Sequence, residues 1–282
     1  MAATNMNILA IGASRNIGYQ SAVRLLEKGA RITFLLRNPS SFANDQTIQA
    51  AVQSGRAKLV KGDAMNEADC RLAWETAGLV DALVFSVGGI PKTTLKGFVL
   101  ETPDLVTKCL LNTLCTMPTY PSHPQPKIVC VSSIGLTPTA HKALPTLMKP
   151  LYAMLDNPHA DKLAMERVLF HCAGWPWDAA SGVPDPAILG VNWQARDGLP
   201  APGTLKRVLI VRPAWLTDGK SQADEIEAGR RKKHEKKAKL GYRYGEEELG
   251  AYVISRADMA HFIANCFDKW NELENKRINV GY

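Results

Sequence analysis

The sequence lacks long apolar runs, a leader-like start and closely spaced cysteines. A helix that crosses a membrane needs about 20 consecutive apolar residues, whereas the longest apolar stretches in these 282 residues are strand-sized, so we expect no membrane partner. The first residues, MAATNMN, contain neither a basic nor a hydrophobic segment, so we expect no secretory signal. The six cysteines show no C-x-x-C spacing. This distribution favours reduced, buried thiols over disulfides or a metal site, and it indicates a cytoplasmic protein.

An excess of basic over acidic residues is also missing outside one segment. The chain has a net charge of +7, but residues 230–239 (RRKKHEKKAK) contain seven basic residues and one acidic residue, which leaves +1 for the rest. No Phe, Tyr or Trp interrupts this segment, whereas surfaces that bind single-stranded nucleic acid interleave such rings with basic residues. We therefore expect no specific nucleic-acid partner.

The chain does contain a regular alternation of short apolar runs and helical patterns, which is typical of βαβ units. Apolar runs such as NILAIG, DALVFS, KIVCVS and RVLIVR fit strands that are buried on both faces of a parallel sheet. We predict a single α/β domain with a doubly wound sheet and with helices at about 17–28, 103–116 and 159–171. The strands are predicted near 6–11, 31–36, 57–60, 81–86, 127–131, 207–211 and 277–280.

A link rich in Trp, Pro and Gly, residues 173–206, looks like an insertion into this plan. A link of this length between a helix and a strand is unusual unless it covers a site. One hypothesis is a lid, and the alternative is a segment that only packs against outer helices. If the link is a lid, four tryptophans can form apolar walls for a substrate: Trp175, Trp177, Trp193 and Trp215.

A second insertion, residues 221–240, is predicted to form a polar helix. Its acidic first half and basic second half suit the helix dipole. Ser221 and Asp224 have the spacing of a capping box, and Glu227 faces Arg231 one turn later. We expect a surface role for this segment.

The turn after the first strand has the pattern of a dinucleotide-binding loop. In GASRNIG (12–18), Gly12 allows a tight turn and Gly18 allows the helix to pack closely on the strand. The middle glycine of the usual pattern is absent, and Asn16 is its expected substitute because Asn tolerates positive φ. The alternative is an ordinary strand–helix turn. Residues expected to face a pyrophosphate at the helix N-terminus are Gly12, Ser14, Arg15, Asn16 and Ile17.

The end of the second strand indicates which dinucleotide binds. An acidic residue there would hold the ribose 2′-hydroxyl of NAD(H), but the sequence has Leu-Arg-Asn-Pro at 36–39. Arg37 offers a planar fork of donors that suits a 2′-phosphate, and Arg15 can approach from the loop. The alternative is that both are solvated surface arginines. The pattern favours NADP(H) over NAD(H).

Seven short motifs follow one another along the chain: GASRNIG, LLRNPS, Gly62-Asp63, Val87-Gly88-Gly89, VCVSSIGL, VRPAWLTDG and ISRADMAHF. In this order they resemble the atypical branch of the short-chain dehydrogenase/reductase superfamily, which includes NmrA-like proteins, biliverdin-IXβ/flavin reductases and epimerase-like proteins. The resemblance covers most of residues 5–281 apart from the two insertions. It implies a Rossmann sheet of order 3-2-1-4-5-6, to which the strand at 277–280 would add a seventh, with the cofactor across the carboxyl ends of the strands.

The resemblance also implies the cofactor contacts. Asp63 would accept the adenine amino group, and Ser132 and Ser133 would end the fifth strand beside the nicotinamide. The alternatives are a solvated turn residue for Asp63 and strand-end capping for the two serines. The implied contacts along the cofactor are Asp63, Ala64, Val87, Gly88, Gly89, Ser132, Pro213, Ala214, Trp215 and Leu216.

The Tyr-x-x-x-Lys pair of the superfamily is missing, because the residue four positions before Lys162 is Pro158. In that pair the Tyr donates a proton to the substrate oxygen, and the Lys lowers the Tyr pKa and holds the nicotinamide ribose. Lys162 is implied to remain the ribose ligand; the alternative is a surface lysine paired with Glu166. The proton donor stays open between Tyr152, Ser133, His159 and solvent. The catalytic residues expected are therefore Lys162, Ser133 and Tyr152.

Together these residues favour an NADPH-dependent reductase that transfers hydride to a small carbonyl, enone or flavin-like substrate. A non-catalytic NADP(H)-binding regulator of the NmrA kind is the alternative, because it would also explain the lost Tyr. Nucleic-acid binding through the basic segment is a third hypothesis. The sequence favours neither a monomer nor a dimer.

Overall fold

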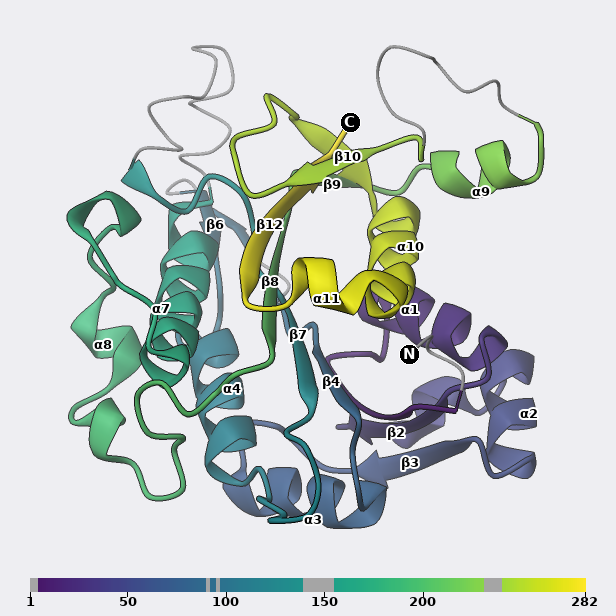
Figure 1. Ribbon diagram of the computed structural model, residues 1–282, viewed down its shortest axis with the longest axis horizontal. Helices are drawn as coiled ribbons and strands as arrows, with labels where there is room; N and C mark the ends of the chain where they lie inside the picture. The colour runs from purple at the N-terminus through teal and green to yellow at the C-terminus, as the bar shows by residue number, and fades with distance from the viewer. Residues whose placement is uncertain (1–4, 90–91, 95–96, 139–154, 231–239) are drawn as a thin grey trace.

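The parallel strands form one sheet at the centre of the chain (Figure 1). The computed structural model describes residues 5–89, 92–94, 97–138, 155–230 and 240–282. In these residues the main sheet has eight strands in the order β10-β12-β8-β7-β4-β1-β2-β3. Their bounds are β1 Asn7–Ile11, β2 Arg31–Leu36, β3 Ala57–Lys61, β4 Ala82–Phe85, β7 Lys127–Val131, β8 Val208–Pro213, β10 Arg243–Gly245 and β12 Lys276–Gly281.

The seven predicted strands and their Rossmann order are confirmed. Strands β1, β2, β3, β4, β7, β8 and β12 all pair in parallel. The eighth strand, β10, lies antiparallel to β12 at the edge and was not predicted. Its three residues are too few to show a period of two in the sequence.

Helices cover both faces of the sheet, as a doubly wound fold requires. Two apolar clusters fill the space between helices and strands, one on each face. The first lies under α1 (Asn16–Glu27), α2 (Gln46–Gln53) and α10 (Arg256–Cys266). The second lies under α3 (Glu67–Ala77), α4 (Leu105–Cys115) and α7 (Asp156–Ala173). Figure 1 shows α1 and α10 side by side on their face, and the two helices are in contact.

Short elements occupy the loops and were not predicted. β5 and β6 form an antiparallel hairpin, and β9 pairs in parallel with β11 beyond the main sheet. The bounds of the short elements are β5 Lys92–Thr94, β6 Gly97–Val99, β9 Trp215–Thr217, β11 Val253–Ser255, η1 Pro39–Phe42, η2 Ala179–Ser181, α8 Pro186–Leu189, η3 Trp193–Ala195, α9 Gln222–Glu227, η4 Phe267–Lys269 and α11 Trp270–Leu273.

The Trp-rich link, residues 173–206, packs along the outer side of α7. Trp175 and Trp177 meet the ring of Phe170 edge-on, with centroids 5.2 and 4.9 Å away. Trp193 is 9% exposed and lies 5.0 Å from the ring of His171. These contacts are those expected of the packing alternative. Of the four tryptophans considered as cavity walls, all of them among the described residues, Trp215 alone lines the large cavity described below, and it lies outside the link.

The predicted polar helix at 221–240 is shorter than expected. Helix α9 ends at Glu227, because Gly229 takes a left-handed conformation (φ +69°) and Arg230 N donates to Glu225 O, which closes the last turn. The capping box is present in part, since Ser221 Oγ accepts from Asp224 N. The expected partner Arg231 lies outside the described residues.

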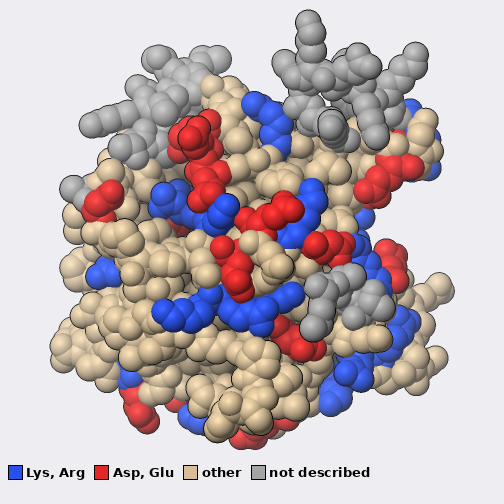
Figure 2. All heavy atoms as spheres, in the orientation of Figure 1, with Lys and Arg blue, Asp and Glu red and all other residues tan. Residues whose placement is uncertain are grey.

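The cysteines are buried, as their distribution in the sequence predicted, and charges of both signs share the surface. All six cysteines are buried and free, and burial raises the pKa of Cys70 to about 11, so it is no nucleophile at neutral pH. On the face shown in Figure 2, basic and acidic side chains are interspersed across the described residues. No helix among the described residues has the length and apolar character needed to cross a bilayer.

Candidate cofactor site and active site

A cavity of about 580 Å³ lies at the carboxyl ends of the parallel strands. Its walls come from the loops after β1, β2, β3, β4, β7 and β8, from the first turns of α1 and α10, and from side chains of α4 and α7. The predicted cofactor contacts meet here although they are far apart in the sequence. Those that line the cavity are Gly12, Ser14, Arg15, Asn16, Ile17, Arg37, Asp63, Ala64, Val87, Gly88, Gly89, Ser132, Lys162, Pro213, Ala214, Trp215 and Leu216.

The loop between β1 and α1 has the geometry of a phosphate cradle. Gly12 has φ +82°, and a Cβ there would lie 2.4 Å from Val87 N, so only glycine fits. Asn16 takes the left-handed conformation (φ +54°) that the sequence analysis expected of it. Arg15 stands at the N-cap of α1 without a side-chain capping bond. The N–H groups of the first turn therefore remain available to an anion, and the residues fit a dinucleotide pyrophosphate.

Two guanidinium groups line the cavity, one from the loop after β1 and one from the residue that follows β2. Arg15 and Arg37 are both exposed, and within the described residues neither has an ion-pair or hydrogen-bond partner. Ser41, which the sequence analysis missed, lines the same wall, where its hydroxyl donates to Asn38 O at 2.8 Å. Free arginine forks suit a phosphate monoester.

Asp63 both stabilises its turn and faces the cavity. Its Oδ1 accepts from Met65 N at 2.9 Å, and its backbone N–H donates to Asp69 Oδ2 at 2.8 Å. The turn role considered above is therefore present. It is compatible with an adenine contact, since the residue also lines the cavity.

Lys162 does not pair with Glu166. Its Nζ donates to Val131 O at 3.0 Å and to Ser132 O at 3.1 Å, at the end of β7. Burial lowers the pKa of Lys162 because the charged ammonium loses hydration. An ammonium has three N–H donors. Two are directed to these carbonyl oxygens, so one remains for a ligand in the cavity.

Glu166 instead belongs to a buried network beneath β7 and β8. Both of its oxygens accept from Arg212, at 2.8 Å from Nε and 2.5 Å from Nη2, and Ser132 Oγ donates to Oε1 at 2.5 Å. Glu166 is 0% exposed and Arg212 is 5% exposed. A buried charge is stable only when it is paired, so Arg212 holds the Glu166 carboxylate in place. Through its hydrogen bond to Ser132, Glu166 in turn fixes the position of Ser132 at the cavity wall.

The candidate proton donors lie close to Lys162. Ser133 and His159 line the cavity, with Ser133 Oγ 3.4 Å from His159 Nε2. Pro158, at the position of the usual Tyr, lines it as well. The third candidate, Tyr152, lies outside the described residues.

One charged residue of the cavity was missed. Arg256, at the start of α10, lines the wall together with Trp215 and Leu216. The sequence feature that could have identified Arg256 is its position in the motif ISRADMAHF, at the start of the residues that form a helix. Nothing in that pattern indicates that β11 pairs with β9 and carries Arg256 to the cavity.

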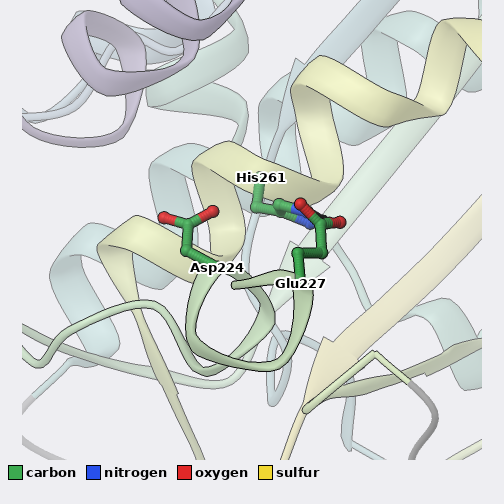
Figure 3. Close-up of side chains that lie close together, drawn as sticks. All are labelled: Asp224, Glu227 and His261. Carbon is green, nitrogen blue, oxygen red and sulfur yellow. Dashed lines mark hydrogen bonds and ion pairs between the residues drawn. The ribbon is translucent and has the colours of Figure 1, made fainter. Parts of the chain in front are cut away.

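A second cluster of ionisable side chains, Asp224, Glu227 and His261, lies between α9 and α10 (Figure 3). Arg24 donates to both oxygens of Asp224, at 2.8 and 2.5 Å. The His261 ring lies 2.9 Å from Glu227 Oε1 through Nε2 and 2.8 Å from the Tyr242 hydroxyl through Nδ1. These protein partners account for the cluster without a metal ion.

Comparisons with known proteins agree with this geometry. Residues 12–177 match the model of a family described as NAD(P)H-binding. The chain belongs to this family. The reductase pytE of Aspergillus terreus is similar to it, with 26% identity over an alignment of 302 positions that covers 100% of both chains.

Solved structures of low identity share the fold. A short-chain dehydrogenase from Burkholderia cenocepacia in complex with NADP has 18% identity and a TM-score of 0.53, over 94% of this chain and 91% of that one. ChuY, an anaerobillin reductase from Escherichia coli, has 14% identity and a TM-score of 0.54, over 97% and 96% of the two chains. The resemblance to the short-chain superfamily is confirmed at the level of the fold.

Proposed function

We propose that the protein is an NADPH-dependent reductase of a small carbonyl, enone or flavin-like substrate. The observation that supports it most is a pair of guanidinium groups, Arg15 and Arg37, which have no partner among the described residues and lie beside a phosphate cradle in which position 12 accepts only glycine. A 2′-phosphate supplies the charge that these groups lack. The reductase name of pytE, a relative that aligns along the whole chain, supports the same reaction class.

The chain's own residues would hold the cofactor along the cavity. The first turn of α1 would bind the pyrophosphate, Arg37 and Arg15 the 2′-phosphate, and Asp63 the adenine amino group. The remaining N–H of Lys162 would donate to the nicotinamide ribose. When bound, NADPH supplies a hydride to the electrophilic carbon of the substrate and leaves as NADP⁺. The apolar side chains of Trp215 and Leu216 would keep water from that end.

The substrate oxygen must gain a proton as the carbon gains hydride. Ser133 would donate that proton, and His159, 3.4 Å away, would replace it. Ser132 is less suited to this role, because its hydroxyl hydrogen is donated to the buried carboxylate of Glu166, whereas that of Ser133 is donated to a neutral backbone carbonyl, Ile134 O, at 3.0 Å. Tyr152 remains a further candidate from the sequence.

Turnover tests the proposal directly. Purified protein is mixed with NADPH and a panel of probes, namely phenanthrenequinone, 2-cyclohexenone and flavin mononucleotide, and the loss of NADPH absorbance is followed. We expect oxidation of NADPH with at least one probe and none without it. Tight NADPH binding without oxidation in any of these mixtures would contradict the reductase and favour the regulator of the NmrA kind.

A further inference from the structure

The cavity carries one cation that the cofactor contacts above do not use. Among the described residues its charged lining consists of four cations and one carboxylate: Arg15, Arg37, Lys162, Arg256 and Asp63. Three of the four cations are assigned to the 2′-phosphate and the ribose. Arg256 has no such assignment.

Arg256 enters the cavity wall from a different part of the sheet than Arg37 does. It follows β11, in which Ser255 pairs with Thr217 of β9, directly after β8. Strands β7, β4 and β1 separate β8 from β2, so the two strand ends are roughly 19 Å apart at about 4.8 Å per strand. The end of β8 adjoins the end of β7, which carries Ser133 and the two carbonyl oxygens that bind Lys162, and Arg256 is connected to the β8 side through the pairing of β11 with β9.

The guanidinium of Arg256 is fixed in direction and only partly used. Its Nη1 donates to Asp218 Oδ1 at 2.6 Å, and the two side chains are 25% and 86% exposed. An arginine has five N–H donors, so several remain for a second oxyanion. The exposed Asp218 is well hydrated and adds little energy to the pair, but it limits the directions the fork can take.

We propose that Arg256 binds a carboxylate of the substrate, so that the enzyme reduces a carbonyl on an apolar or aromatic acid. The apolar body of such an acid fits the cavity walls formed by Trp215, Leu216 and Leu155. A guanidinium beside apolar walls binds a carboxylate more strongly than one in open water. This inference rests on the proposed function for the identity of the ligand as substrate. A cofactor phosphate would offer Arg256 the same kind of oxyanion. It is the competing ligand, because α10 packs beside α1, whose first turn would bind the pyrophosphate.

Equilibrium binding to the NADP⁺-saturated protein separates these sources without requiring turnover. The probes are 2-naphthoate and 2-naphthamide, which share a ring system and differ in charge, titrated by calorimetry. We expect the wild type to bind the acid at least about tenfold more tightly than the amide, which corresponds to about 1.4 kcal/mol. Arg256→Met should remove that preference and leave amide affinity unchanged. Arg31→Met, a loss of charge at the exposed start of β2, is the matched control and should keep the preference.

Three results would overturn the inference. The wild type could bind the acid and the amide equally, or it could bind neither. Alternatively, Arg256→Met could weaken NADP⁺ binding about tenfold and keep the acid preference, which would assign Arg256 to a cofactor phosphate. Failure of the proposed function has a different signature, because the acid and NADP⁺ would then bind as expected while no carbonyl probe is reduced.

Discussion

Ser132 Oγ lies 2.5 Å from Oε1 of Glu166, a carboxylate that solvent does not reach. An ionised carboxylate only accepts hydrogen bonds, so Ser132 must donate its hydroxyl hydrogen to it. Toward the cavity Ser132 can therefore only accept. The two adjacent serines at the end of β7 are unequal, because Ser132 donates to a buried carboxylate, whereas Ser133 Oγ donates to the neutral carbonyl oxygen of Ile134 at 3.0 Å, a weaker bond that a substrate oxyanion can replace.

This inequality predicts different effects of removing each hydroxyl. Ser133→Ala should lower kcat by about 10²-fold, because the developing oxyanion loses its proton donor. Ser132→Ala is the matched control and should lower kcat less than about tenfold, since its hydroxyl is directed away from the reaction. Steady-state kinetics with the most active carbonyl probe measures both. A larger loss of kcat in Ser132→Ala than in Ser133→Ala would contradict this assignment.

Lys162 predicts how cofactor binding depends on pH. The ammonium has one N–H beyond those directed to Val131 O and Ser132 O, and a neutral amine has none. Burial lowers the Lys162 pKa, so binding should be full below that pKa and should weaken, as pH rises through it, at a lower pH than an ordinary lysine requires. Lys162→Met should bind NADPH about tenfold more weakly, with no such dependence. Calorimetry across the alkaline range measures both. Identical pH profiles for the two proteins would show that this lysine does not hold the cofactor.

Gly12 can be compared with another glycine of positive φ. A Cβ at Gly12 (φ +82°) would lie 2.4 Å from Val87 N, whereas a Cβ at Gly55 (φ +71°) would meet nothing within 4 Å. Gly55→Ala should cost about 1 kcal/mol of unfolding free energy from strain alone and leave NADPH affinity intact. Gly12→Ala should cost about 3 kcal/mol and weaken NADPH binding. Denaturant titration and calorimetry distinguish them, and equal costs with equal affinities would exclude the cradle.

The Trp-rich link predicts an effect on stability and none on binding. Trp193 is 9% exposed, packs on His171, and does not line the cavity. Trp193→Ala should therefore cost about 3 kcal/mol of unfolding free energy and leave the Kd of NADPH and the KM of a carbonyl probe unchanged. Thermal denaturation and steady-state kinetics give the two quantities. A changed KM at unchanged melting temperature would instead support a lid.

The predictable part of the fold rested on local signals. Buried parallel strands such as β1 are continuously apolar, and Gly12, Asn16 and Gly18 have backbone or packing requirements that their own residue types reveal. The order of the strands came from the resemblance. For these reasons the wall of the cavity from Gly12 to Arg37 could be predicted from the sequence.

Contacts between distant segments could not be predicted in the same way. Arg256 reaches the cavity through the pairing of two three-residue strands, β9 and β11, which have no period to detect. The tryptophans of 173–206 are as suitable for packing against α7 as for covering a site, so composition left both alternatives open. The end of α9 at Glu227 depends on Gly229. Residue types that favour helices follow this glycine, and for that reason the sequence pattern predicted a helix that continues to residue 240.

The central claim is that the cavity selects NADPH through Arg37. The most direct test is a pair of calorimetric titrations of the wild-type protein, one with NADPH and one with NADH. The account predicts at least about tenfold tighter binding of NADPH, which corresponds to about 1.4 kcal/mol. Arg37→Asp should erase most of that difference, while Arg31→Asp, at the opposite end of the same strand, should retain it. Equal affinities of the wild type for NADPH and NADH would contradict the account.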